Sequence, residues 1–160
     1  MSTISELRLK DQIFVRSYRW RRIDPVPWAP VQKPLSESRL GLVSSAGLSA
    51  PGQEAFDVKK KGGDPAYREI PAEVDVQELI ENHRSQSWDH RGVEQDKNVA
   101  FPIDRAKELV EAGRIGSLSD RHLSFMGSIT APGRFVRDFV PRAAEVFVEE
   151  EVDVALLVPV

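Results

Sequence analysis

The sequence contains no cysteine, and this absence is the first constraint on its chemistry. Disulfide bonds, cysteine-ligated zinc, iron–sulfur clusters and a thiol nucleophile are therefore excluded from these residues. An excess of basic residues is also missing, because 22 Lys and Arg stand against 25 Asp and Glu. The formal net charge of -3 gives no reason to expect a nucleic acid as partner.

Long apolar runs are absent as well. No run approaches the length of a transmembrane helix, and the first residues, MSTISELRLKDQIF, lack the apolar segment of a signal peptide. We therefore expect a cytoplasmic protein with no membrane contact. The chain of 160 residues, 41% hydrophobic and 29% charged, is long enough for one globular domain with its own core.

Several motifs of nucleotide-binding and hydrolytic enzymes are missing. The stretch RLGLVSSAG (39–47) predicts a strand that enters a turn of small residues, Ser44, Ser45, Ala46 and Gly47. Such a turn is typical of nucleotide-binding folds, but G-x-G-x-x-G and the P-loop lysine are absent. Without G-x-S-x-G, Ser45 is a poor candidate for a hydrolase nucleophile. A tight turn over the edge of a sheet is the simpler interpretation.

The histidines match no strong metal-binding motif. His83 and His90 enclose a short segment that contains Asp89, and imidazole and carboxylate groups both bind divalent metals. The spacing differs from H-E-x-x-H, so ordinary loop residues are the simpler interpretation. No metal site is assigned, and a metal-dependent hydrolase that uses these three residues stays open as an alternative. For His122, a hydrogen-bonded position in the core is expected.

The N-terminal part differs in composition from the rest. Residues 3–22 have roughly helical spacing of apolar residues. Residues 24–34 hold four prolines among eleven residues, which excludes both helix and sheet. We therefore divide the chain into an N-terminal helix with a proline-rich arm, 1–34, and an α/β domain, 35–160.

Strands and helices alternate in the second part. The predicted strands cover 39–47, 66–71, 122–127 and 154–158, and the predicted helices cover 101–118 and 133–153. The unbroken apolar run at 154–158 is typical of a strand that is buried on both faces in a parallel sheet. The fold class that follows is α/β, a Rossmann-like three-layer domain with a mainly parallel sheet. We expect the sheet to be incomplete at its C-terminal end.

Charged residues give three further candidates. The basic run at 59–61 is far shorter than a nucleic-acid patch and predicts a solvated loop, and the acidic run at 149–151 predicts a solvated helix end. Asp104 and Arg105 begin the clearest helix. Asp104 would stabilise the N-terminal end of that helix. Alternatively, the pair faces a ligand carboxylate, which an arginine binds in a bidentate manner.

Three stretches together resemble a known family: KPLSESRLGLVSSAG (33–47), DKNVAFPIDRAKELVEAGRIGSLSDRHLSFMG (96–127) and EEVDVALLVPV (150–160). They resemble the selenoprotein B family of the glycine, sarcosine, betaine and D-proline reductases, and the order of the blocks fits the smaller, D-proline-reductase-like members. The resemblance covers most of the chain from Trp20 onward. Its most specific part is the block N-x-x-F-P-I-D-R…G-x-I-G-S-L…S-F-M-G.

This resemblance implies a redox group that the present residues lack. In that family, the strand corresponding to 154–158 leads into a motif with selenocysteine, or with cysteine in some relatives. The implied reaction is attack by a selenolate on the α-carbon of a small amine or amino-acid substrate, with reductive cleavage of the C–N bond. Thiols then regenerate the selenol. Other reductase subunits are implied as partners, and one of them could carry a pyruvoyl-type carbonyl that activates the amine.

We hypothesise that Val160 precedes an in-frame UGA codon, and that the chain is a truncated subunit which is inactive alone. The alternative is a complete but redox-inactive relative that binds a ligand or a partner. An incomplete sheet would expose an apolar edge, which favours a homo-oligomer. No cofactor is expected in the chain itself. The candidate substrate-pocket residues, placed at strand ends and at one helix start, are Ser44, Ser45, Ala46, Gly47, Asp104, Arg105, Met126, Gly127, Pro159 and Val160.

Overall fold

The computed structural model describes residues 4–18, 22–85 and 88–160, and the chain divides into two units, Met1–Pro30 and Val31–Val160. The first unit contains η1 (Ile4–Glu6) and α1 (Leu9–Ser17), neither of which has a buried residue. The helix was predicted over 3–22, but α1 covers only Leu9–Ser17. Residues 3 and 19–21 of the predicted range lie outside the described part. Within the described ranges, no helix has the length and apolar character needed to cross a bilayer.

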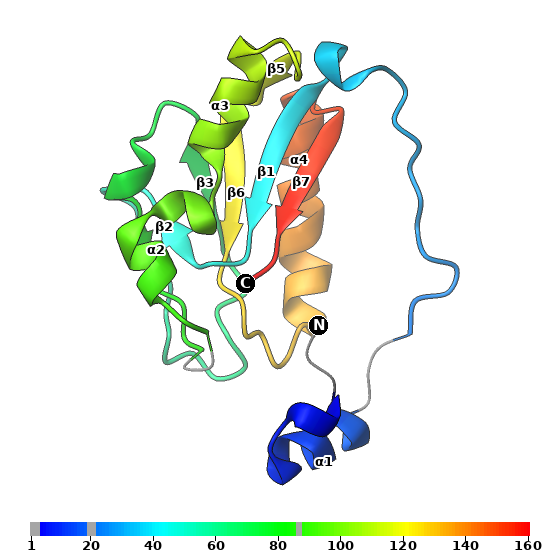
Figure 1. Cartoon of the computed structure of the whole chain (residues 1–160), viewed down its shortest axis with the longest axis vertical. Coiled ribbons are helices and arrows are strands. Elements are labelled where there is room, and N and C mark those ends of the chain that lie inside the picture. The colour runs from blue at the N-terminus through cyan, green and yellow to red at the C-terminus, as the bar shows by residue number, and fades with distance from the viewer. Residues whose placement is uncertain (1–3, 19–21, 86–87) are drawn as a thin grey trace. The chain divides into compact units, whose positions relative to one another are not determined.

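A mixed sheet is the framework of the second unit (Figure 1). β1 (Arg39–Ser44) pairs in parallel with β5 (Ser117–Leu118) and β6 (Arg121–Phe125) on one side. On its other side, β1 pairs in parallel with β7 (Val154–Val158). β3 (Tyr67–Pro71) joins the far side of β6 in the antiparallel direction. The prediction of a mainly parallel sheet is confirmed.

Helices lie on both faces of this sheet (Figure 1). α3 (Ile103–Glu111) covers one face, and the helix formed by η5 (Phe135–Phe139) and α4 (Val140–Glu149) covers the other. This arrangement confirms the predicted three-layer α/β class. The π-helical turn η5 ends two residues before Pro141. Proline has no backbone N–H to donate to a carbonyl of the preceding turn. A proline inside a helix removes one backbone hydrogen bond, which accounts for a distortion at this point.

Several short elements connect the larger helices and strands. One of them, the helix α2 (Arg91–Gln95), was not predicted. Residues 75–83 contain a single 3-10 turn and a short strand of a separate two-stranded sheet. The short elements are η2 (Leu35–Glu37), β2 (Leu48–Ser49), η3 (Val76–Glu78), β4 (Ile80–Glu81), α2 (Arg91–Gln95) and η4 (Lys97–Val99).

A glycine in β1 lets α4 approach the sheet. Leu123, Ala143 and Val146 are buried between the helix and the sheet, and Phe147 packs against them. A methyl group on Gly41 would lie 2.7 Å from a carbon of the Phe147 ring, which is closer than carbon atoms pack. The absence of a side chain at this position is therefore what allows the ring to lie against β1.

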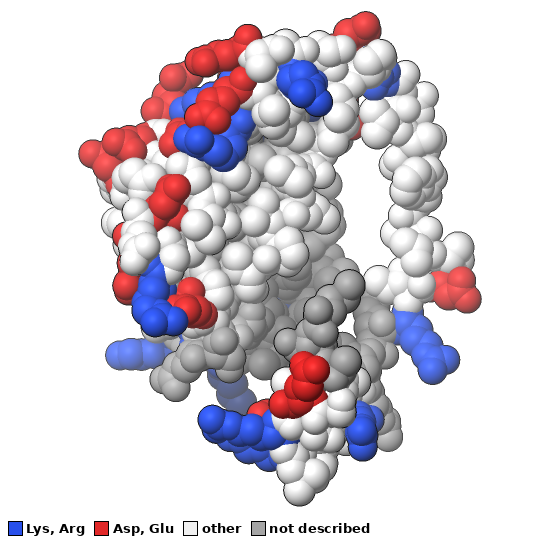
Figure 2. Space-filling model, in the orientation of Figure 1, with Lys and Arg blue, Asp and Glu red and all other residues white. Residues whose placement is uncertain are grey.

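The strand β7 differs from the prediction of a strand buried on both faces. Among the described residues it pairs with β1 alone, so it forms an edge of the sheet. Leu156 and Leu157, which alternate between the two faces, are 44% and 67% exposed. Figure 2 shows charged side chains of both signs over α3 and β5, whereas the surface over β1 and β7 is mostly uncharged. The apolar run therefore forms an uncovered edge, because neither helix layer extends over all of it.

An ion-pair cluster fixes the end of the sheet where β1 and β6 begin. Arg121 bonds to carboxylate oxygens of Glu150 at 2.7 Å, Glu149 at 2.9 Å and Glu69 at 3.2 Å. Glu150 also pairs with Arg39 at 3.3 Å, and its side chain is only 12% exposed. The hydrogen bond from Arg121, above all, lowers the pKa of Glu150 to about 2. The prediction of a solvated acidic helix end is therefore wrong for Glu150.

His122 occupies the hydrogen-bonded core position that was expected. It is fully buried, and its Nδ1 accepts the backbone N–H of Leu42 at 3.1 Å. Phe101 packs edge-on against its ring, with 6.0 Å between the ring centroids. Its Nε2 has no hydrogen-bond partner among the described residues. Burial lowers the pKa of His122 to about 4, because a charged imidazole in this core would lose its hydration.

The depressed pKa of His122 predicts a loss of stability on mild acidification. The unfolded chain takes up a proton near pH 6.5 and the folded chain only near pH 4. Neutral His122 therefore contributes fully to the free energy of unfolding above pH 6.5. This contribution decreases by on the order of 3 kcal/mol as the pH falls to 4. The lowered pKa of Glu150 affects stability at lower pH, because its contribution is present above pH 4.5 and is lost as the pH falls from 4.5 toward 2.

Urea unfolding between pH 7 and pH 4.5 measures this effect. The wild-type free energy of unfolding should fall steadily as the pH is lowered over this range. Its slope against pH should be clearly smaller in His122→Gln, whatever the absolute stability of that variant. Equal slopes in the two proteins would contradict the assignment.

Candidate functional site

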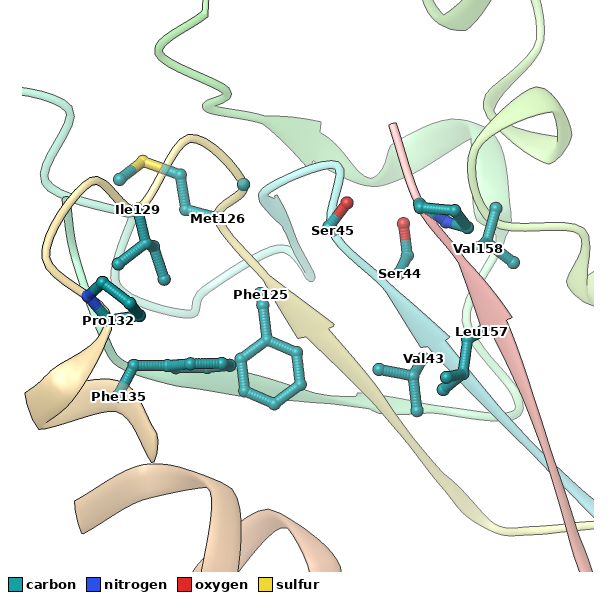
Figure 3. A pocket seen from close by; sticks show the side chains of 12 residues that line it. Val43, Ser44, Ser45, Phe125, Met126, Ile129, Pro132, Phe135, Leu157 and Val158 are labelled. Atoms are coloured by element: carbon teal, nitrogen blue, oxygen red, sulfur yellow. The ribbon is translucent and has the colours of Figure 1, made fainter. Parts of the chain in front are cut away.

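A cavity of about 360 Å³ opens at the edge of the sheet where β1, β6 and β7 end (Figure 3). Ligands bind at the carboxyl ends of parallel strands in open α/β sheets, so this edge is the expected place for a site. Each neighbouring element contributes an apolar side chain to the walls. Val43 comes from β1, Phe125 from β6, Leu157 from β7 and Phe135 from η5.

The three strand-end segments predicted from the sequence meet at this cavity. Ser44 and Ser45, Met126 and Gly127, and Pro159 all line it. Val160 lies next to the cavity, and its backbone N–H donates to Ser45 Oγ at 3.0 Å. Ala46 and Gly47 do not line the cavity, but they belong to the turn that follows β1 and hold it in place. Ala46 is fully buried and bridges to Met126, and Gly47, at φ +67°, accepts the N–H of Asn82 at 2.9 Å.

Asp104 and Arg105 do not line this cavity. The Asp104 carboxylate accepts the side-chain N–H of Asn98 at 2.9 Å, and the Asp104 N–H donates to the Asn98 side chain at 3.1 Å. Arg105 pairs with Glu108 at 2.9 Å and borders a separate cavity between α3 and β7. The reciprocal bonds with Asn98 favour a role for Asp104 in holding the start of α3.

The two serines at the end of β1 hold backbone rather than act as nucleophiles. Ser44 is fully buried, donates to the Ala100 carbonyl at 2.7 Å and accepts the Ala46 N–H at 3.1 Å. Ser45 Oγ accepts the Val160 N–H. In the described part of the chain, neither hydroxyl bonds to a histidine or a carboxylate. No base is therefore placed to activate either oxygen.

The cavity walls are apolar, a feature that the sequence interpretation missed. Phe125 and Phe135 meet edge to face, with 4.9 Å between ring centroids and 89° between ring planes. Among the residues described, no Lys, Arg, Asp or Glu contributes to the lining. Apolar walls of this kind suit the carbon skeleton of a small ligand. Position in the sequence could have indicated both residues, because Phe125 directly precedes Met126 and Leu157 lies two residues before Pro159.

His83 lies behind the Gly127 segment of the wall. A methyl group on Gly127 would be 2.5 Å from His83 Nε2 and 2.9 Å from the Ser45 carbonyl oxygen. His83 Nδ1 accepts the Ser85 N–H at 3.2 Å, so in the neutral ring Nε2 carries the proton. That buried nitrogen has no hydrogen-bond partner in the described ranges. Burial lowers the pKa of His83, which keeps the ring neutral at pH 7.

His90 and Asp89 are engaged by other partners. His90 Nδ1 lies 2.8 Å from Glu81, whose hydrogen bond raises the pKa of His90, and its Nε2 lies 3.0 Å from a backbone carbonyl. The Asp89 carboxylate pairs with Arg91 at 2.7 Å. No group of three or more His, Cys, Asp or Glu side chains suited to a metal ion occurs in the described part of the chain. The geometry therefore gives the metal-dependent hydrolase no support.

The contact between His83 and Gly127 predicts the effect of adding one methyl group. Gly127→Ala should displace the His83 ring toward solvent and move its pKa back toward the ordinary value of 6.5, because the burial that lowers it is lost. NMR titration of the imidazole resonances measures this change, and the chain has only three histidines to assign. Gly133→Ala is the matched control, since no atom lies within 4 Å of its added methyl group. An unchanged His83 titration in Gly127→Ala would contradict the contact.

Similarity to known proteins agrees with the resemblance found in the sequence. A family described as glycine/sarcosine/betaine reductase selenoprotein B matches residues 5–159. D-proline reductase subunit gamma of Acetoanaerobium sticklandii is 32% identical over 136 residues, which are 84% of this chain and 54% of that protein. The chain thus spans about half the length of this relative. No solved structure matches the chain. Because the family match extends over nearly all of the sequence, the chain belongs to the selenoprotein B family of glycine, sarcosine and betaine reductases.

Proposed function

We propose that these residues form part of a subunit that reductively cleaves a C–N bond of glycine, sarcosine, betaine or a D-proline-like substrate. One observation carries the proposal. The three family-like blocks, 33–47, 96–127 and 150–160, are far apart in the sequence, yet each contributes residues to the cavity at the carboxyl edge. A cavity built from these blocks is the best candidate for the substrate site.

The redox group must come from outside the 160 residues, because these contain no cysteine. We infer a selenocysteine or cysteine in a segment that follows β7. Such a residue supplies an ionised nucleophile, and external thiols replace the two electrons that reduce the C–N bond. The position of the cavity suits this group, because Ser45 holds the Val160 backbone beside it at 3.0 Å.

The cavity walls suggest how the substrate would be held. Phe125, Phe135 and Leu157 would contact the carbon skeleton of the substrate. No acidic side chain of the described lining is available to bind the amine. We therefore infer that a partner reductase subunit activates the amine, with a pyruvoyl-type carbonyl as the expected group. A homo-oligomer and a cytoplasmic location stay predictions.

The first experiment identifies the reading frame after the Val160 codon. We expect UGA, followed by a frame that encodes a family-like segment. UAA, UAG or an unrelated frame would contradict the hypothesis of a truncated selenoprotein and would favour the redox-inactive relative.

The second experiment tests the cavity in the extended protein, with cysteine at the UGA position and the partner subunits present. We expect weak dithiol-dependent reduction of at least one substrate, and none with the 160-residue chain. Leu157→Asp places a charge in the apolar cavity and should reduce kcat/KM at least about tenfold, which corresponds to about 1.4 kcal/mol. Leu156→Asp, on the other face of β7, is the matched control. Equal losses in the two variants would contradict the proposed site.

A further inference from the structure

A second cavity, of about 430 Å³, adjoins the first at Pro132 and has the opposite chemical character. Lys60 and Lys61 line it from the loop before β3, and Arg134 and Arg137 line it from the start of the η5–α4 helix. Of the described residues, no Asp or Glu takes part in this lining. Such a concentration of positive charge is notable in a chain with a net charge of -3.

The two segments that carry these cations are joined through glycine backbone. The Gly62 carbonyl accepts the N–H of Thr130 at 3.0 Å and of Ala131 at 3.3 Å. Gly62 and Gly63 have φ values of +88° and +99°, which other residues rarely adopt. A methyl group on Gly62 would also lie 3.0 Å from the Ala131 side chain. The cationic segments are therefore held close together by the backbone, independently of any bound ligand.

The carboxylates nearby do not balance this charge. Buried Asp64 pairs with Lys60 at 3.0 Å. Asp138 bonds to Arg137 at 2.6 Å, and this bond, together with the charges of Arg134 and Arg142, lowers the pKa of Asp138. One carboxylate thus faces three guanidinium groups. Lys61, on the facing loop, adds a further positive charge to the same cavity. Like charges held together cost free energy, which a bound anion would offset.

We propose that this basic cavity binds a small oxyanion, a phosphate or a carboxylate group. Lysine and arginine side chains are the ones that bind such groups in proteins, and arginine does so with a planar pair of N–H donors. The volume of about 430 Å³ suits a small molecule rather than a macromolecular partner. The proposal goes beyond the reductase function and needs no redox group, so the 160-residue chain is sufficient for its test.

NMR titration of the 160-residue chain tests the proposal, with inorganic phosphate and succinate as separate probes at constant ionic strength. We expect at least one anion to give saturable shifts in the backbone signals of residues 60–63 and 131–137. The double variant Lys61→Ala/Arg134→Ala should raise the dissociation constant at least about tenfold. Lys59→Ala/Arg114→Ala is the matched control, because neither of these exposed cations lines the cavity, and the dissociation constant should stay within about twofold.

The two probes also distinguish the sources of the oxyanion. Saturation by phosphate alone assigns a phosphate group, and saturation by succinate alone assigns a carboxylate. No saturation by either anion, or equal affinity in the wild type and the double variant, would overturn the proposal. Should the double variant fail to fold, as judged by its circular dichroism spectrum, Lys61→Gln alone replaces it with the same criterion.

Discussion

The parallel pairing of β1 with β7 is the interaction on which the rest of the structure depends. It aligns Leu40–Ser44 with Val154–Val158, so segments from opposite ends of the domain become neighbours. The alignment continues beyond the ladder, where the Ser45 N–H donates to the Val158 carbonyl at 3.1 Å. Because β6 pairs with the other side of β1, three strand ends meet at one edge. Without β7, the apolar cavity would lose the wall formed by Leu157, Val158 and Pro159.

The two ends of the sheet carry different chemistry. Where β1 and β6 begin, Arg121 and Glu150 form a cluster of ion pairs that fixes the end of α4 against the sheet. Where the strands end, the walls are apolar and open, and Ser45 bonds to the backbone of Val158 and Val160. The ion pairs that stabilise the fold are thus separated from the apolar cavity. The basic cavity beyond Pro132 adds the charge that the apolar cavity lacks.

Local pattern predicted β1, α3 and the helix before β7, because each has a clear apolar period or a terminating glycine. The helix predicted over 101–118 was too long, since α3 ends at Glu111 and residues 117–118 form β5. It could not predict α2 or β2, which are too short for a period to show. It misjudged β7, since an apolar run indicates packing but does not reveal where a sheet ends. Phe135 belongs to the predicted helix 133–153, but its place in the cavity depends on its contact with Phe125 of β6, which the spacing of residues does not reveal. Asp104 and Arg105 could not be assigned from sequence, because the partners Asn98 and Glu108 decide their orientation.

Amide hydrogen exchange of the β1–β7 pair tests this account most directly. The Ser45 N–H bonds to the Val158 carbonyl at 3.1 Å, and the Asp153 N–H bonds to the Arg39 carbonyl at 2.9 Å, so the two amides report on opposite ends of the pairing. We expect both amides to exchange at least about a hundredfold more slowly than in an unstructured chain. Exchange of both amides at the unstructured rate would show that β7 does not hold this position, and the cavity would then have no third wall.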